Sequence, residues 1–244
     1  MDKIWIIFKR ELASYFITPV AYVFIVIFLF LTGIFTFSIG GFFERGQASL
    51  ESFFGFHPWL YLFLIPAITM RLWSEERKSG TIELLLTLPI SMQHAVIGKF
   101  MAAWVFAGIA LVLTFPVWIT VNYLGDPDNG VIAAGYIGSL LMAGGFLAIG
   151  SFISSLTKNQ VIAFVLSVVV SLLFVLAGFG VVLDAFSGWA PQSVVDVISR
   201  MSFLTNFSSI GKGIIDMRSI IYFASLIFCF LFANAIMVEL KKAE

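Results

Sequence analysis

Long, nearly uninterrupted runs of apolar residues dominate the chain, and six of them are long enough to cross a lipid bilayer. A membrane-spanning helix needs roughly 17–25 predominantly apolar residues. The six runs predict helices at approximately 20–41, 53–70, 100–124, 131–153, 161–183 and 220–238. The pattern therefore predicts an all-α polytopic membrane protein, with residues 1–244 forming a single transmembrane domain.

Residues 3–18, which precede the first run, have the pattern of an amphipathic helix. Trp5, Phe8 and Leu12 fall on one helical face, and basic residues fall elsewhere. This spacing predicts a helix that lies in the membrane surface. A frayed basic tail is the alternative interpretation.

The segment between the fifth and sixth runs, 184–219, is only moderately polar. Val194, Val197, Ile198 and Met201 recur at helical spacing after Pro191. We therefore expect an amphipathic helix here that lies on the outer surface or dips into it, so that the segment is partly re-entrant. A plain extracytoplasmic loop is the alternative.

Composition agrees with a membrane protein, because 60% of the residues are hydrophobic and only 11% are charged. Formal net charge is zero, so nothing in the overall charge favours nucleic acid as a partner. The single cysteine, Cys229, rules out a disulfide within the chain and argues against a metal site built from thiolates.

The basic residues are distributed unevenly between the two sides of the predicted helices. Ten lie on the side of both termini, and four, Arg45, Arg200, Lys212 and Arg218, lie on the other. Cytoplasmic loops carry the excess of Lys and Arg. The sequence therefore predicts that both termini are cytoplasmic, in the inner (cytoplasmic) membrane.

Residues that could support catalysis or ion coupling are few. No ionisable residue is expected near a helix centre: Lys99 and His57 are placed near helix ends, as is Asn234 among the polar residues. His57 and His94 are predicted on opposite membrane faces, which excludes a shared metal site. The chain also lacks the G-x-x-x-x-G-K-[ST] phosphate loop. It is therefore not expected to be an enzyme, and no metal site is predicted.

The stretch "MRLWSEERKSGTIELLLTLP", at 70–89, concentrates charge between two apolar runs. Its charges are followed by a short helical pattern over 82–88, which ends before Pro89. A helix of this length is marginal without a packing surface, so it requires a partner. A helix that rests on lipid is the alternative.

This stretch carries a resemblance to a known family. The pattern E-R-x-x-G-T-x-E-x-L-x-x-x-P occurs here, together with "KRELASYF" near the N-terminus and "TKNQVIAF" between the fourth and fifth runs. In these motifs and in its six spans, the whole chain resembles the ABC-2 type permeases, the membrane subunits of ATP-binding-cassette exporters. Within that family it looks most similar to the permeases associated with gliding motility.

The resemblance implies a transport function driven by a separate cytoplasmic ATPase, which would bind the ATP and Mg²⁺, so that this chain itself needs no cofactor. By match to the motif, the ATPase-coupling residues would be Glu75, Glu76, Gly80, Thr81, Glu83, Leu84, Leu85 and Pro89. Lys158, Asn159 and Gln160 would form a second cytoplasmic contact.

The resemblance also implies a second permease, identical or related, as a partner within the lipid membrane. An extracytoplasmic protein is a further candidate partner, and no nucleic acid is expected. The alternative function is that of a membrane scaffold or anchor subunit of a multiprotein complex, without transport activity of its own.

Overall fold

The computed structural model describes residues 2–81, 91–213 and 216–241. These ranges contain helices and connecting turns, with no strand among them. The helices are α1 (Asp2–Ile17), α2 (Pro19–Ile34), the π-helix η1 (Phe35–Ile39), α3 (Glu51–Thr69), α4 (Ser74–Ser79), α6 (Met92–Val112), α7 (Phe115–Leu124), α8 (Asn129–Leu156), α9 (Gln160–Leu176), α10 (Gly180–Ser187), α11 (Gln192–Arg200), α12 (Phe203–Gly211) and α13 (Met217–Leu240).

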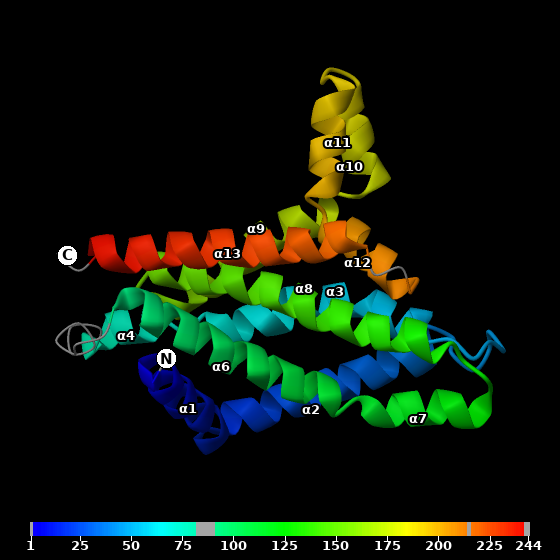
Figure 1. The fold of residues 1–244 in the computed structure, drawn as a ribbon, viewed down its shortest axis with the longest axis horizontal. Helices are drawn as coiled ribbons and strands as arrows, with labels where there is room; N and C mark the ends of the chain where they lie inside the picture. The colour runs from blue at the N-terminus through cyan, green and yellow to red at the C-terminus, as the bar shows by residue number, and fades with distance from the viewer. Residues whose placement is uncertain (1, 82–90, 214–215, 242–244) are drawn as a thin grey trace.

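The long helices run side by side along one axis, and both ends of the chain lie at the same end of this bundle (Figure 1). We call this the terminal end. Five helical segments are long and apolar enough to cross a membrane, and the bent pair of α9 and α10 makes up to six. The all-α, polytopic architecture predicted from the sequence is therefore confirmed.

Helix α1 confirms the predicted N-terminal helix, and the frayed-tail alternative is wrong. It packs on α6 through the buried Ile7, while Trp5 remains 53% exposed. Gly98 permits this approach, because a Cβ at that position would lie 2.8 Å from the Ile7 side chain.

The third and fifth predicted spans differ from the structure. Helix α6 begins at Met92, well before the expected start, and breaks at Thr114 because Pro116 has no N–H with which to continue its hydrogen bonds. Helix α9 ends at Leu176, and the chain turns by 75° into α10. At this turn Gly178 lies against Ser202, where a Cβ would come within 2.4 Å of the hydroxyl oxygen.

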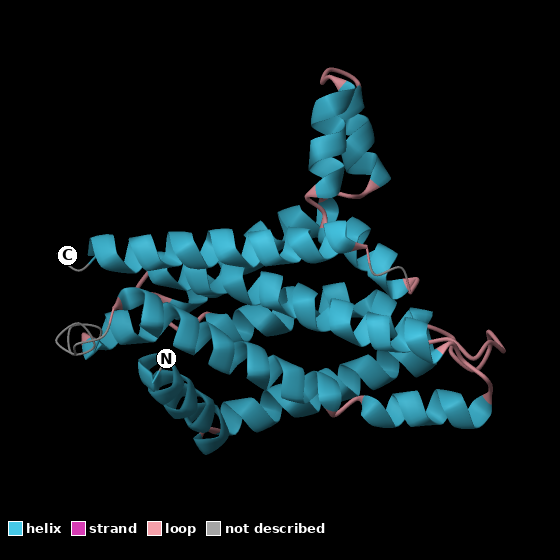
Figure 2. Ribbon diagram, in the orientation of Figure 1, coloured by secondary structure: helices cyan, strands magenta, loops and turns pink. Residues whose placement is uncertain are grey.

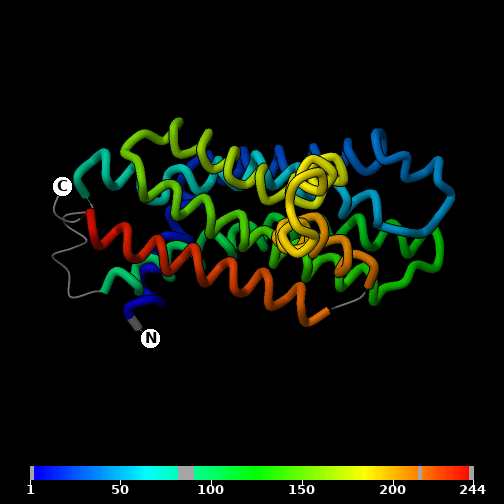
Figure 3. The backbone as a smooth tube through the Cα atoms, turned by 90° about the horizontal axis from the view of Figure 1, so that it is seen from above, coloured from blue at the N-terminus to red at the C-terminus, as the bar shows by residue number. Residues whose placement is uncertain are grey.

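Helices α10 and α11 form a hairpin that projects sideways from the bundle (Figure 2). Figure 3, seen from above, shows both helices end-on, so the hairpin is roughly perpendicular to the bundle axis. Helix α11 confirms the amphipathic helix expected after Pro191, and the plain-loop alternative is wrong. The hairpin exposes Val181 and Trp189, at 82% and 75%.

Helix α8 lies at the centre of the bundle and contacts α3, α6, α9, α12 and α13. Its small residues allow this close packing. A Cβ on Gly135 would lie 2.4 Å from the Phe54 ring, and one on Gly150 would lie 2.1 Å from Thr69 Oγ1. Small faces of this kind let membrane helices approach closely.

Candidate functional site

The charged turn predicted from the sequence lies at the terminal end, between α3 and α6. Helix α4 carries Glu75 and Glu76 in its first turn and Arg77 and Lys78 in its last, an order that complements the helix dipole. Gly80 ends the helix in the left-handed conformation, with φ 73°, which glycine adopts without steric cost.

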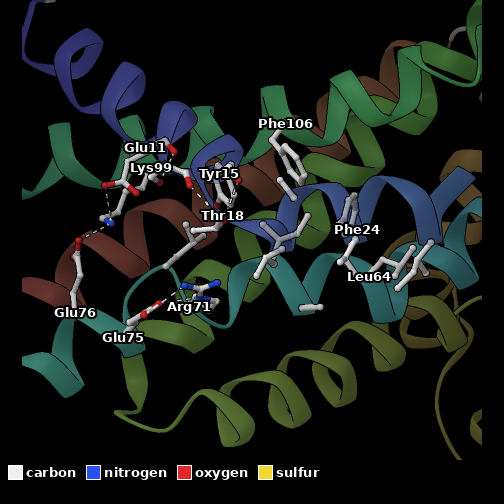
Figure 4. A pocket seen from close by; sticks show the side chains of 18 residues that line it. Glu11, Tyr15, Thr18, Phe24, Leu64, Arg71, Glu75, Glu76, Lys99 and Phe106 are labelled. Atoms are coloured by element: carbon white, nitrogen blue, oxygen red, sulfur yellow. Dashed lines mark hydrogen bonds and ion pairs between the residues drawn. The ribbon is translucent and has the colours of Figure 1, made fainter.

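Lys99 connects this turn to two other helices, as Figure 4 shows. Its Nζ lies 2.8 Å from Glu76 Oε1 on α4 and 3.2 Å from Glu11 Oε1 on α1, and it sits 5.4 Å above the Trp73 ring. Lys99 itself belongs to α6 and is only 2% exposed. One buried ammonium group therefore joins α1, α4 and α6; we call Glu11, Glu76 and Lys99 the ionic cluster.

The sequence places Lys99 near a helix end, within reach of the membrane surface, and that expectation is wrong. Because α6 begins at Met92, Lys99 lies inside the helix and is covered by α1. Two carboxylates and an aromatic ring face it there, and they compensate for its removal from water.

The charges of the ionic cluster perturb Glu11. Burial alone would raise the pKa of this carboxyl, but the nearby Lys99 and Arg10 cations together lower it by more, so its pKa lies below the usual value of 4.5. Glu11 is therefore ionised at neutral pH.

Serine side chains of α8 fix the backbone of the turn. Ser154 Oγ accepts hydrogen bonds from the backbone N–H groups of Trp73 and Ser74, at 3.1 and 3.2 Å, and donates to the Met70 carbonyl at 3.0 Å. Ser151 Oγ accepts from the Trp73 indole at 3.2 Å. The turn is consequently attached to α8 as well as to α6.

Arg77 adds a further link between α4 and α8. Its guanidinium donates to the Ser155 carbonyl at 2.7 Å, near the last turn of α8. Arg71 instead pairs with Glu75 one turn later, with Nε 2.9 Å from Oε2. Contacts of α4 extend to α9 as well as α8.

The second predicted contact, residues 158–160, lies at the same end of the bundle. Asn159 Oδ1 accepts from the Val161 and Ile162 N–H groups and so caps the start of α9. Lys158 is exposed beside it.

The structure thus brings together part of the predicted coupling set. Glu75, Glu76, Gly80 and Thr81 lie at the terminal end with the 158–160 turn. Glu83, Leu84, Leu85 and Pro89 lie outside the described residues.

Glu11, Lys99, Ser151 and Ser154 belong to this site, although the sequence pattern did not predict their membership. The spacing of Ser151 and Ser154 on one helical face, in "GSFISSL", offered a signal for the serines. No local pattern indicated that Glu11 and Lys99 meet, because they are far apart in the chain.

A second polar group is buried deeper in the bundle, between α3 and α8. The Ser139 hydroxyl lies 2.7 Å from Tyr61 OH and 2.9 Å from His57 Nδ1. His57 is fully buried among aromatic rings, although it lies in the second turn of α3, near the helix end where the sequence places it. Asn234 is likewise buried and donates to Ser151 Oγ at 2.8 Å.

A protein-family model described as "ABC-2 family transporter protein" matches residues 5–238. The chain belongs to the ABC-2 transporter family. It is therefore a multi-pass membrane protein and the permease component of an ABC transporter, a class of subunit that associates with an ABC ATPase. The match does not distinguish the gliding-motility subgroup within the family. No curated protein sequence matches this ABC-2 permease.

Proposed function

We propose that this ABC-2 permease is the membrane subunit of an exporter, and that the ionic cluster transmits movement of a cytoplasmic ATPase to the spanning helices. The observation that carries the proposal is the position of Lys99. It holds the α4 turn, which leads directly into the predicted coupling segment, to α1 and α6 at once. A displacement of α4 would therefore move both helices.

In this proposal the coupling element consists of Glu75, Glu76, Gly80, Thr81, Glu83, Leu84, Leu85 and Pro89, and the ATPase receives it in a cleft. Lys158, Asn159 and Gln160 make the second contact. The exposed Lys158 and the nearby α4 support this arrangement, since one partner surface can touch both.

The terminal end faces the cytoplasm in this proposal, and the protein resides in the inner membrane. The excess of basic residues predicted for this side supports the orientation. ATP and Mg²⁺ bind to the ATPase subunit, because this chain has no phosphate loop. A second permease, identical or related, completes the transporter.

The test uses two substitutions in the coupling segment, Glu83→Arg and Leu85→Asp. Each is expected to abolish ATPase binding or transport while the permease still inserts and purifies normally. Glu44→Arg, an exposed charge reversal near the opposite end of the bundle, is the matched control. Wild-type ATPase binding and transport in both coupling variants would refute the role assigned to this segment.

An ATPase variant that assembles but cannot hydrolyse ATP tests the function itself. Under the exporter proposal, loss of hydrolysis abolishes the cellular function. If the function survives, the chain acts as a scaffold that assembles other proteins.

A further inference from the structure

A cavity of about 340 Å³ lies between α1, α2, α3 and α6, close to the ionic cluster (Figure 4). Its volume falls in the range of sites that hold small organic ligands, roughly 300–1,000 Å³. The coupling role proposed above does not use this space. Its lining divides into an apolar part and a charged part.

The apolar part is formed within the bundle by α2, α3 and α6. Phe24 and Ile27 line it from α2, Leu64 and Ala67 from α3, and Phe106 from α6. This wall presents hydrocarbon and aromatic surface, which favours an apolar chain over water.

The charged part lies at the terminal end and contains groups of both signs. Glu11, Glu75 and Glu76 contribute three carboxylates, against the two cations of Arg71 and Lys99. Carboxylates are therefore in excess, and they disfavour a ligand whose headgroup is purely anionic.

Two groups in the charged part retain hydrogen-bonding capacity toward a ligand. Arg71 pairs with Glu75 through Nε and Nη2, at 2.9 and 3.5 Å, and its Nη1 has no hydrogen bond within the described residues. Glu75 is the most accessible of the three carboxylates, because its side chain is 48% exposed, against 14% for Glu11 and 19% for Glu76. A free donor and an accessible carboxylate thus lie in one lining.

We propose that this cavity binds a phospholipid whose headgroup carries both a phosphate and a primary ammonium, as phosphatidylethanolamine does. The phosphate is recognised by Arg71 and the ammonium by Glu75, and one acyl chain lies against Phe24 and Leu64. Choline lipids lack the ammonium N–H that a carboxylate oxygen requires, and phosphatidylglycerol lacks the ammonium altogether. The inference concerns binding alone and holds whether or not the lipid is transported.

The first test measures headgroup preference by native mass spectrometry. The full chain is purified in detergent, stripped of lipid and titrated with phosphatidylethanolamine, phosphatidylcholine or phosphatidylglycerol of identical acyl chains. We expect one saturable phosphatidylethanolamine per chain, bound about tenfold more tightly than the other two, which is the effect of one charge-assisted hydrogen bond. Equal affinities, or binding without saturation, would overturn the proposal.

The second test fills the apolar part without changing any charge. Ala67→Phe projects a ring into the cavity and is expected to remove the saturable site, whereas Ala224→Phe, on an exposed position of α13, leaves it unchanged. Arg71→Gln should reduce phosphatidylethanolamine affinity about tenfold, and Arg45→Gln, an exposed residue outside the site, should not.

Each variant is compared with the wild-type chain by gel filtration and thermal unfolding, so that misfolding is recognised. Wild-type affinity in a folded Ala67→Phe protein would place the lipid elsewhere. These binding measurements contain no ATPase or nucleotide, so a failure to bind the lipid would not contradict the exporter proposal. Likewise, a failure of the ATPase-coupling tests would not contradict lipid binding.

Discussion

Replacing Lys99 by Met tests whether the ionic cluster holds the terminal end together. Methionine fills a similar volume but removes the ammonium, which leaves the Glu11 and Glu76 carboxylates facing each other in a partly buried space. Their side chains are only 14% and 19% exposed, so water compensates them poorly. The variant should therefore lose stability at neutral pH.

The size of the loss follows from the burial of the three groups. Removing one partner of a buried ion pair costs about 3–5 kcal/mol. Here Arg10 still contacts Glu11 at 2.6 Å and both carboxylates keep some exposure, so we expect about 2–3 kcal/mol. Adding Glu76→Gln removes the stranded charge and should recover about 1–2 kcal/mol of that loss.

The assay is equilibrium unfolding in mixed micelles, in which a denaturing detergent is increased and tryptophan fluorescence is recorded. Trp73 lies beneath Lys99 and is one of the six tryptophans of the chain, so part of the signal comes from the site. Lys212→Met, an exposed position on another part of the bundle, should change the free energy of unfolding by no more than about 0.5 kcal/mol. A Lys99→Met variant as stable as this control would refute the reasoning.

Three further variants test other parts of the structure. Gly150→Ala places a Cβ 2.1 Å from Thr69 Oγ1 and should destabilise the protein by about 1–3 kcal/mol, measured by the same unfolding assay. Because the Glu11 pKa is lowered on folding, its contribution is present above pH 4.5 and is lost as pH falls through the folded value; Glu11→Gln should flatten the stability profile in that acidic range. Asn159→Ala removes the cap of α9, costs about 1 kcal/mol and should speed amide hydrogen exchange at its first turn.

Controls for these variants come from the same or contacting positions. Thr69→Ala removes the Oγ1 and Cγ2 contacts but leaves a Cβ 2.8 Å away, so it should restore part of the stability of the Gly150→Ala protein. No recovery at all would mean that the clash with the Thr69 hydroxyl is not the cause. An unchanged acid profile in Glu11→Gln would contradict the pairing with Lys99. Asn159→Asp keeps a capping oxygen and should preserve slow exchange.

The number and approximate position of the spanning helices could be predicted because bilayer thickness sets their length. Breaks within a span were harder to predict. The bend after Leu176 depends on the packing of Gly178 against Ser202, a contact between segments that the apolar pattern does not record. Pro116 was visible in the sequence, but it lies inside an apolar run that continues on both sides.

Only part of the candidate site could be predicted from the sequence. The charges of α4 were evident, since they stand together between apolar runs. The pairing of Lys99 with Glu11 could not be predicted, because it arises only when α1 packs on α6. The burial of His57 has the same kind of origin, because it depends on aromatic rings of α2 and α3 and on Ser139 of α8.

The central position of α8 limits where cargo can pass. In the most apolar 18-residue stretch of α8, 72% of the residues are buried. The corresponding share is 28% for the α2–η1 segment and 17% for α13. A helix enclosed by its neighbours cannot border a passage unless those neighbours separate. Helices α2, α9 and α13 each have a free side, so a conduit that ran along any of them would take its facing wall from another molecule.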